Sequence, residues 1–413
     1  MILIKKNGNH KMKTLFGLPE KVIFCKKCVE SNQRFMGSKQ TNDQKNQKKQ
    51  TAQFDKDGVC LSCRYFEKKT KINWNDREKE FVEILNKYRS KDGHYDVLVP
   101  GSGGKDSRFV SHILKHKYNM NPLTCTWAPH IYTDIGIKNF NSWINNGFDN
   151  ILYTPNGKVH KTLTQLAFKN LLHPFQPFVM GQFYLAPKIA VEKKIKLIIY
   201  GDSYAEKGIG GSLYDEGKSL NPKIFTYKKG DDLFFGGVHQ SELKKYKINN
   251  IDLIPYLPIE EEVLKETDLE VLVLPYFLNY NPQKNFYYAV ENTNFEVNPE
   301  GRTDGTYTKY QSLDDKIDGL HYYTWFIKTG RGRATEDAAL EVRNNIITRE
   351  EAVALVKQYD GELPQRYFKD ALEYLSISEK DFFETIDKFR SPHLWEKKKD
   401  KWFLKKAVWM LNK

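Results

Sequence analysis

The chain has 413 residues, of which 40% are apolar, and its 65 basic and 52 acidic residues give a net charge of +13. This length allows two or three domains with a sizeable core. No apolar run approaches the roughly 20 residues of a membrane span, and the N-terminal apolar stretch is too short for a signal peptide, so a soluble cytoplasmic protein is predicted. The basic residues are spread along the chain without an RNA-binding signature, which favours anionic small substrates over nucleic acid.

The first 75 residues are predicted to form a small metal-binding module. Four of the five cysteines form two CxxC pairs: Cys25 with Cys28, and Cys60 with Cys63. Two such pairs without a secretion signal indicate a metal rather than disulfides, and four thiolates suit a tetrahedral structural Zn²⁺. Residues 37–53, between the pairs, are polar and are predicted to form a flexible surface loop. Cys125 lies in a predicted strand and is interpreted as a small core residue.

Helix and strand patterns alternate from residue 76 to about 205. Strands are predicted at 95–100, 122–127, 150–155 and 196–202, and helices at 76–89, 107–116, 137–148 and 181–195, the last broken near Pro187. This alternation predicts an α/β fold with a doubly wound parallel sheet, in which ligands bind at the carboxyl ends of the strands. Residues 206–300 show less regular patterns.

The region from 301 to 413 is predicted to be mainly helical. Thr348 with Glu351 forms a capping-box pattern, and Gly361 suits the end of the same helix. Trp395, Trp402 and Trp409 recur every seven residues, which predicts the core-facing stripe of a further helix.

The segment SGGKDS, residues 102–107, lies between a predicted strand and a predicted helix. Its two glycines allow backbone N–H groups to approach an anion, and the helix directs its N-terminal dipole to the same point. Ser102 and Ser107 add hydroxyl donors and Lys105 adds a positive charge. Asp106 would repel a phosphate unless a cation such as Mg²⁺ lay between them. The loop is therefore predicted to bind a phosphate anion.

SGGKDS resembles the signature of the PP-loop ATP pyrophosphatases, in which the loop holds the departing pyrophosphate while AMP is transferred to a substrate oxygen. The resemblance implies ATP and Mg²⁺ and a PP-loop domain over residues 76–300. It also implies sites at the ends of the second and fourth strands. The ATP-binding residues implied are Ser102, Gly103, Gly104, Lys105, Asp106, Ser107, Thr126, Trp127 and Gly201. The catalytic residues proposed from it are Lys105, Asp106, Asp202 and Glu206. Because some members that thiolate tRNA carry an iron–sulfur cluster, such a cluster stays an alternative to zinc at the cysteines.

Residues 299–353 crowd cations with aromatic side chains, which suits an anionic, sugar-bearing ligand. The substrate-binding candidates are Arg302, Thr303, Lys316, Lys328, Arg331 and Arg333. Ion pairs with the neighbouring aspartates, among them Asp314, Asp315, Asp318 and Asp337, explain the same composition equally well.

The motif order resembles the N-acetyl sugar amidotransferases of bacterial or archaeal surface-glycan biosynthesis, such as lipopolysaccharide O-antigen. The motifs are CxxC twice, SGGKDS, EGRTDGTY, SLDDKID, GRGRATEDA and ITREEAV, over about residues 22–395. Gly201-Asp202-Ser203, where the family often has Gly-Glu-Asn, and the 37–53 insert depart from the pattern. The resemblance implies that 301–413 binds a nucleotide- or lipid-linked N-acetyl sugar and that its acetamido group becomes an acetamidino group, with release of AMP and pyrophosphate.

The chain shows no glutaminase signature, because no cysteine lies near the N-terminus and Cys125 lacks the glycines of a nucleophile elbow. A separate glutaminase subunit is therefore predicted to supply ammonia, with or without a cyclase-like channel subunit. The alternative interpretation is a PP-loop enzyme that modifies tRNA, a thiolase or a lysidine-type ligase, which the basic charge and the cysteines also fit.

Overall fold

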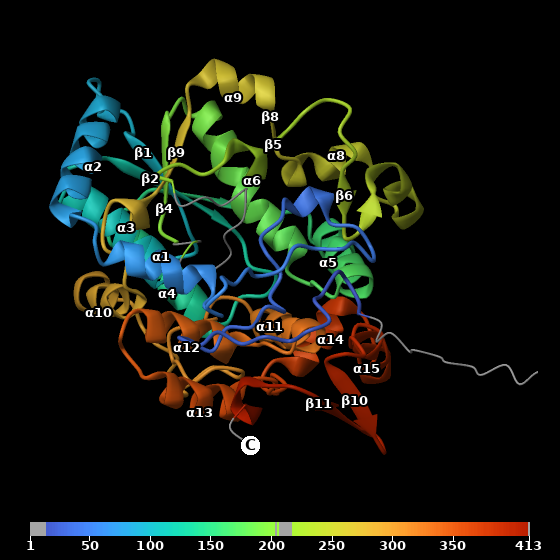
Figure 1. Ribbon diagram of the computed structural model, residues 1–413. Coiled ribbons are helices and arrows are strands. Elements are labelled where there is room, and N and C mark those ends of the chain that lie inside the picture. Colours follow the sequence, from blue (N-terminus) through green and yellow to red (C-terminus); the bar gives the residue numbers. More distant parts are fainter. Residues whose placement is uncertain (1–13, 203–204, 206–216, 412–413) are drawn as a thin grey trace, which may run out of the picture.

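The computed structural model describes residues 14–202, 205 and 217–411. At its centre lies a five-stranded sheet in the order β3-β2-β1-β4-β9, with every neighbouring pair parallel (Figure 1). The strands are β1 (Val97–Pro100), β2 (Pro122–Trp127), β3 (Asn150–Tyr153), β4 (Leu197–Tyr200) and β9 (Glu270–Val273). The predicted α/β class with a parallel sheet is confirmed.

Helices cover both faces of this sheet (Figure 1). They are α2 (Trp74–Tyr88), α3 (Lys105–His116), α4 (Asp134–Asn145), α5 (Gly157–Leu171), α6 (Gln176–Glu192) and α10 (Pro282–Thr293). Because successive strand residues point to opposite faces, Leu98 and Ile198 pack in one core cluster with residues of α5 and α6. Val97 and Ile199 pack on the other side with residues of α2 and α3. The sheet is therefore doubly wound, as the alternating pattern predicts.

The strand order reverses between β1 and β4, whose central residues Leu98 and Ile198 are paired in register. In doubly wound sheets this switch point opens a crevice at the carboxyl ends of the strands. β1 ends at Pro100 and β4 at Tyr200, so the SGGKDS loop and Gly201-Asp202 follow neighbouring strand ends. The topology thus places two separated candidate segments side by side.

Three elements in and around the central sheet differ from the sequence predictions. α5 and β9 were not predicted, since β9 is only four residues long and lies in a stretch without clear periodicity. α6 runs through Pro187 without the predicted break. Pro187 is among the buried residues of this helix, and the surrounding packing offsets the hydrogen bond that proline cannot donate.

The remaining segments between β4 and α10 form short elements around the sheet. They are β5 (Thr226–Tyr227), β6 (Phe234–Phe235), β7 (Val238–His239), β8 (Ile259–Glu260), α8 (Asn250–Leu253), α9 (Glu261–Thr267), and the 3₁₀ helices η2 (Pro222–Ile224), η3 (Gln240–Tyr246), η4 (Ile254–Tyr256) and η5 (Leu274–Tyr276).

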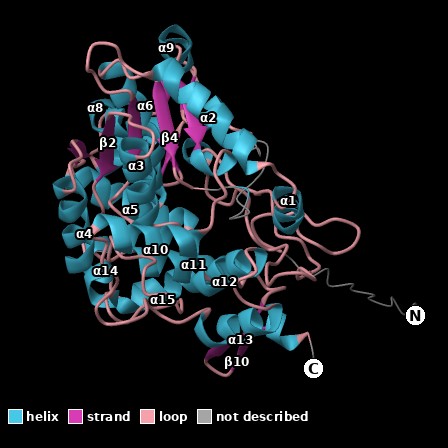
Figure 2. Ribbon diagram, turned by 90° about the vertical axis from the view of Figure 1, so that its left-hand side faces the viewer, coloured by secondary structure: helices cyan, strands magenta, loops and turns pink. Residues whose placement is uncertain are grey.

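The C-terminal region forms a helical layer beneath the sheet (Figures 1 and 2). It contains α11 (Asp318–Thr329), α12 (Arg333–Arg343), α13 (Arg349–Tyr359), α14 (Phe368–Leu375), α15 (Glu379–Asp387), the hairpin of β10 (Trp395–Lys398) and β11 (Lys401–Leu404), and η6 (Val408–Met410). The capping box of Thr348 and Glu351 is confirmed at the start of α13. Among the described helices, none is long and apolar enough to cross a membrane.

The predicted tryptophan stripe is wrong. Trp395 lies in β10, Trp402 in β11 and Trp409 in η6, so the spacing of seven arises from an antiparallel hairpin and the turn after it. Trp395 is buried and its indole N–H donates to the carbonyl oxygen of Ile327 at 2.8 Å, which fixes the hairpin on α11.

The N-terminal segment, with η1 (Gln40–Asn42) and α1 (Leu61–Lys69), runs between the sheet and the C-terminal helices (Figure 1). The insert 37–53 is not the free surface loop that its composition predicts. Asp43 in it is buried, accepts from Ser38 at 2.9 Å and pairs with Lys49 at 2.6 Å. Polar side chains that form hydrogen bonds and ion pairs with one another can be buried, so a polar sequence does not by itself predict an exposed loop.

Candidate functional site

The glycine loop joins the end of β1 to the first turn of α3. Gly103 has a φ of +84°, and a Cβ added there would lie 3.0 Å from the Cα of Phe140. A Cβ at Gly101 would lie 2.1 Å from the Cβ of Ser107. A side chain at Gly101 would displace the loop from α3, and one at Gly103 would displace it from α4, so both glycines are required by the close approach of the backbone.

The polar groups of the loop lie at the N-terminus of α3. The hydroxyl of Ser107 donates to the carbonyl oxygen of Gly104 at 3.0 Å. Lys105 forms an ion pair with Asp106, which also accepts from the Asn285 side chain at 3.3 Å. A lysine, a carboxylate and a helix N-terminus therefore meet at one point, as an anion site with a bridging cation requires.

Arg108 was missed by sequence reasoning, and it braces the loop from behind. Its side chain is fully buried, and its Nε donates to the carbonyl oxygen of Gly103 at 2.7 Å. Its other nitrogens contact the carbonyl oxygens of Asn139 and Thr293. No signal in the sequence shows that this arginine turns back to the loop rather than towards solvent.

The ends of β2 and β4 complete this part of the site. The hydroxyl of Thr126 donates to the carbonyl oxygen of Gly101 at 2.7 Å, which ties the end of β2 to the loop. A Cβ at Gly201 would lie 2.8 Å from the side chain of Val110 and 3.3 Å from the carbonyl oxygen of Asp106. The end of β4 therefore abuts the first turns of α3. Glu206 lies outside the described residues.

One large cleft, with a volume of about 470 Å³, connects this loop to the C-terminal region. From the predicted ATP site it is lined by Ser102, Gly104, Lys105, Asp106, Ser107, Trp127, Gly201 and Asp202. From the C-terminal region it is lined by Tyr310, Gln311, Ser312, Asp314, Asp315, Asp318, His321, Tyr322, Trp325, Lys328, Arg333 and Glu336. Residues of the insert and of α6 form the rest of the wall. Gly103 and Thr126 are not in the lining and support it from behind.

The aspartates of the SLDDKID motif lie on the wall of this cleft, where the sequence suggested only counter-ions. Burial raises the pKa of Asp314, and a side-chain hydrogen bond with Ser102 opposes that shift. Asp315 accepts from the Nδ1 atom of His130 at 2.7 Å. Burial raises the pKa of Asp318 to about 7. The C-terminal region therefore contacts the glycine loop directly and brings a carboxyl group that can exchange a proton near neutral pH.

The six predicted substrate-binding residues fall into two groups. Lys328 and Arg333 line the cleft. The other four are engaged elsewhere: Arg302 pairs with Glu362 at 2.7 Å, Thr303 donates to the carbonyl oxygen of Gln311 at 2.9 Å, Lys316 pairs with Asp370 at 3.0 Å, and Arg331 pairs with Glu30 at 2.9 Å. Arg333 itself pairs with Asp337 at 3.1 Å. In the described cleft, seven carboxylates and four cations form the lining, so the basic charge of the chain is not concentrated there.

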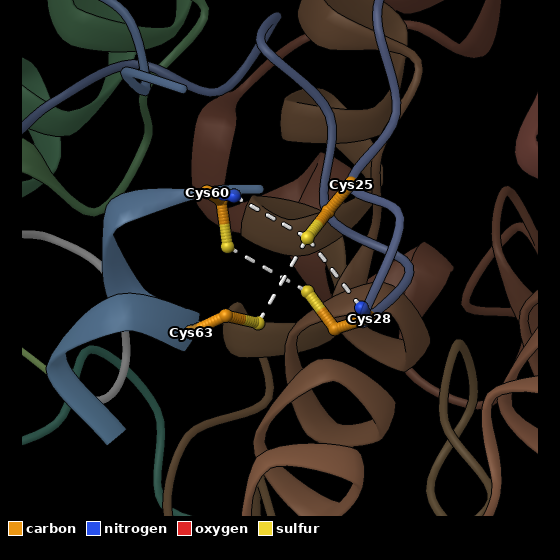
Figure 3. A group of neighbouring side chains, drawn as sticks. All are labelled: Cys25, Cys28, Cys60 and Cys63. Carbon is orange, nitrogen blue, oxygen red and sulfur yellow. Dashed lines mark hydrogen bonds between the residues drawn. The ribbon is translucent and has the colours of Figure 1, made fainter. Parts of the chain in front are cut away.

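The four predicted metal ligands converge (Figure 3). The sulfur atoms of Cys25, Cys28, Cys60 and Cys63 are buried and all lie within 4.8 Å of one another. The Sγ atoms of Cys25 and Cys63 are 3.8 Å apart, and those of Cys28 and Cys60 are 3.7 Å apart. This set could hold one metal ion and fits a zinc knuckle.

The C-terminal helices hold the cysteine cluster from one side. Arg343, at the end of α12, is buried, and its guanidinium lies 3.6 Å from the sulfur of Cys28 and 3.8 Å from that of Cys60. Arg349 donates to the carbonyl oxygens of Cys28 and Cys25 at 3.3 and 3.4 Å. These contacts offset the negative charge of clustered thiolates and fasten the N-terminal module to the C-terminal region.

Comparisons with known proteins match separate parts of the chain. Residues 304–408 match the family model described as "LPS biosynthesis protein WbpG-like, C-terminal domain". The uncharacterized protein MJ1599 of Methanocaldococcus jannaschii is 34% identical over 74 residues, which are 18% of this chain and 26% of that protein. The chain thus matches about a quarter of the length of this curated relative.

Three solved structures resemble parts of the chain at low identity. The predicted subunit of tRNA methyltransferase from M. jannaschii has 14% identity and a TM-score of 0.24, over 47% of this chain and 74% of that one. The NH3-dependent NAD synthetase of Campylobacter jejuni has 12% identity and a TM-score of 0.28, over 54% and 86%. The U34-tRNA thiolase NcsA of Methanococcus maripaludis, which has a [4Fe-4S] cluster, has 11% identity and a TM-score of 0.29, over 79% and 90%. At these TM-scores the likenesses carry no functional argument.

Proposed function

We propose that this chain is an ATP-dependent, AMP-forming amidotransferase that converts the acetamido group of an N-acetyl sugar into an acetamidino group, in surface-glycan biosynthesis. The observation that supports this most is the single cleft that joins the SGGKDS loop to the region matching the WbpG-like C-terminal domain. A cleft of this kind can hold a nucleotide and a sugar with their reacting groups together.

The chemistry explains why such a loop is needed. An acetamido carbon is a poor electrophile because nitrogen donates into the carbonyl and oxygen is a poor leaving group. Transfer of AMP from ATP to the carbonyl oxygen releases pyrophosphate and creates an imidate with AMP as a good leaving group. Ammonia then attacks the carbon, a proton is lost, and AMP departs with the former amide oxygen.

The described residues suit these steps. We propose that the backbone amides of the glycine loop, with Ser102, Ser107 and Lys105, hold the pyrophosphate as its charge develops. The carboxylate of Asp106 at the same point fits Mg²⁺, which when bound would neutralise charge on the phosphates. Asp202 and Glu206 stay candidates for the group that accepts a proton from the attacking ammonia. Asp318 is a third candidate, because its pKa lies near neutrality.

We propose that the sugar lies against α11 and the start of α12. Tyr322 and Trp325 can face the sugar ring, while Glu336 can accept hydrogen bonds from its hydroxyl groups. Lys328 and Arg333 remain the proposed contacts for a negatively charged part of the substrate. For Arg302, Thr303, Lys316 and Arg331 we propose a structural role, because each contacts protein groups and none is among the residues that line the cleft.

We propose that the metal at the four cysteines is zinc. A tetrahedral site with Zn–S bonds of about 2.3 Å places its sulfurs roughly 3.8 Å apart, which matches the separations of 3.7 and 3.8 Å. In an iron–sulfur cluster the thiolates bind separate iron atoms and must spread around the whole cluster. The zinc ion would stabilise the fold around the four cysteines and would take no part in the reaction.

We propose that a separate glutaminase supplies the ammonia. Cys125 is buried in β2, and burial raises the pKa of its thiol, the opposite of what a nucleophilic cysteine needs. The same property counts against a tRNA thiolase that would use Cys125 as its sulfur carrier.

Mass spectrometry of nucleotide-linked N-acetyl sugars incubated with the protein, ATP, Mg²⁺ and ¹⁵N-ammonium chloride tests the proposal. The expected product has one oxygen replaced by ¹⁵NH and forms with AMP in equal amounts, and the Lys105→Ala variant should form neither. AMP release that requires tRNA instead of a sugar would contradict the proposal and favour the tRNA-modifying alternative.

A further inference from the structure

A narrow side cavity lies next to the cleft, between the insert and the end of α5. Its volume is about 30 Å³, room for a water-sized molecule but not for a nucleotide or a sugar. It is lined by Phe16, Phe35, Asp43, Gln44, Asn46, Gln47, Lys49, Asn170, Leu171, His173 and Lys328. Gln44 and Asn46 are exposed, so the side cavity reaches the surface at the insert.

The inner end of the side cavity meets the cleft. Five residues line both spaces: Phe35, Asp43, Lys49, His173 and Lys328. The two spaces therefore share this part of their walls, and a small molecule that passed these side chains would enter the cleft beside α11. This route is separate from the part of the cleft at the glycine loop.

The charged groups at this neck are Asp43, Lys49 and Lys328, with His173 beside them. Lys49 is paired with Asp43 at 2.6 Å, and the buried Lys328 amine donates to the carbonyl oxygen of Leu171 at 3.0 Å. An ammonium ion that enters this buried neck would lose more hydration energy than neutral ammonia would. The one carboxylate in the described lining of the side cavity, Asp43, is already paired with Lys49, so it does not offset that loss.

Two buried histidines, His173 at the neck and His321 in the cleft beyond it, each offer a ring nitrogen to a small polar molecule. The Nδ1 atoms of His173 and His321 are buried and have no hydrogen-bond partner among the described residues. Their rings lie 4.9 Å apart, and both histidines line the cleft. Burial lowers the pKa of both imidazoles and so favours the neutral ring, in which one nitrogen can accept a hydrogen bond and the other donates.

We propose that the side cavity is the entry route for ammonia, which passes Lys328 and His173 into the cleft. The inference rests on the proposed function and adds to it the path of the nucleophile and a role for the insert 37–53. Size excludes ATP and the sugar from the passage, and burial at the neck selects neutral ammonia over the ammonium ion.

The route can be tested with plug variants, in which a tryptophan blocks the surface opening of the side cavity. Gln47 and Gln44 line the side cavity from the surface, and Gln53 is an exposed glutamine of the same insert that does not line it. With ammonium chloride as nitrogen source, Gln47→Trp and Gln44→Trp should each raise the KM for ammonium by about tenfold or more and leave the KM for ATP unchanged. Gln53→Trp should change neither constant.

The outcomes separate the two proposals. If wild-type protein converts the sugar and both plug variants keep the wild-type KM for ammonium, ammonia enters elsewhere and the route is wrong. If wild-type protein forms no amidinated sugar with ammonium chloride at all, the proposed function fails and the route fails with it. Circular dichroism and zinc content of each variant identify one that has misfolded, and the second plug variant then decides.

Discussion

Replacing Arg331 with methionine distinguishes a substrate-binding arginine from a structural one. The side chains of Arg331 and Glu30 are each only 2% exposed, and the Nε and Oε1 atoms are 2.9 Å apart. Arg331 also lies 3.5 Å from Glu336, and Glu30 lies 3.5 Å from Arg34. Removing one partner of a buried ion pair costs about 3–5 kcal/mol. Because Arg34 still faces Glu30 in the variant, we expect the free energy of unfolding to fall by about 3 kcal/mol, the lower end of this range.

Urea denaturation followed by tryptophan fluorescence measures this loss, with the KM for the sugar determined on the same preparations. Arg302→Met is the matched control, since Arg302 pairs with Glu362 on the surface and its side chain is 37% exposed. We expect that control to lose less than about 1 kcal/mol. If Arg331→Met kept wild-type stability and raised the KM for the sugar, Arg331 would be a substrate contact and the argument from the buried pair would be refuted.

Three further predictions concern the loop, the metal and the cleft carboxylate. Lys105→Ala and Asp106→Ala should each abolish AMP release with an unchanged circular dichroism spectrum; turnover above about a tenth of wild type would contradict the role of the loop. Cys25→Ser should lose bound zinc and lower the melting temperature before the KM for ATP changes, and full stability after metal chelation would oppose this. The pKa of Asp318 is about 7 in the fold, above its unfolded value, so the native carboxyl holds a proton that the unfolded chain releases. Asp318 should therefore contribute a loss of stability as pH rises from about 4 to 7, and Asp318→Asn should make the fall in stability over this range smaller than in wild type; parallel urea-midpoint profiles of the two proteins would contradict it.

The sheet and the glycine loop could be predicted because their signals are local. The strand before the loop, the two glycines and the helix after it stand within about twenty residues of sequence, and each restricts the same short piece of backbone. The cysteine cluster could be predicted for a similar reason, since the CxxC spacing itself presents two sulfurs to one ion. In these cases the local sequence decides where the residues lie relative to one another.

The partners of the C-terminal cations could not be predicted, because they lie far away in the sequence. Arg331 pairs with Glu30 across 301 positions, and Asp315 contacts His130 across 185. Composition showed that cations and carboxylates were both abundant, but only the fold decides which cations are neutralised and which line the cleft. The same limit explains Trp395 and Trp402, whose spacing fits a helix until the turn between β10 and β11 is known.

The buried ion pairs also connect the cysteine module to the cleft. Glu30 follows the metal ligand Cys28 by two residues, Arg331 bridges it to Glu336, and Glu336 lines the cleft. If this chain of contacts couples the two sites, the double variant Glu30→Gln with Arg331→Met should be more stable than the sum of the single losses predicts, by about 1–3 kcal/mol. Zinc content measured on the same variants should fall in Glu30→Gln, because loss of the ion pair with Arg331 would shift residue 30, whose carbonyl oxygen accepts from the backbone N–H of the ligand Cys25 at 2.8 Å. Strictly additive losses of stability would show instead that Glu30 and Arg331 are not coupled, and an unchanged zinc content would show that this pair does not act on the metal ligands.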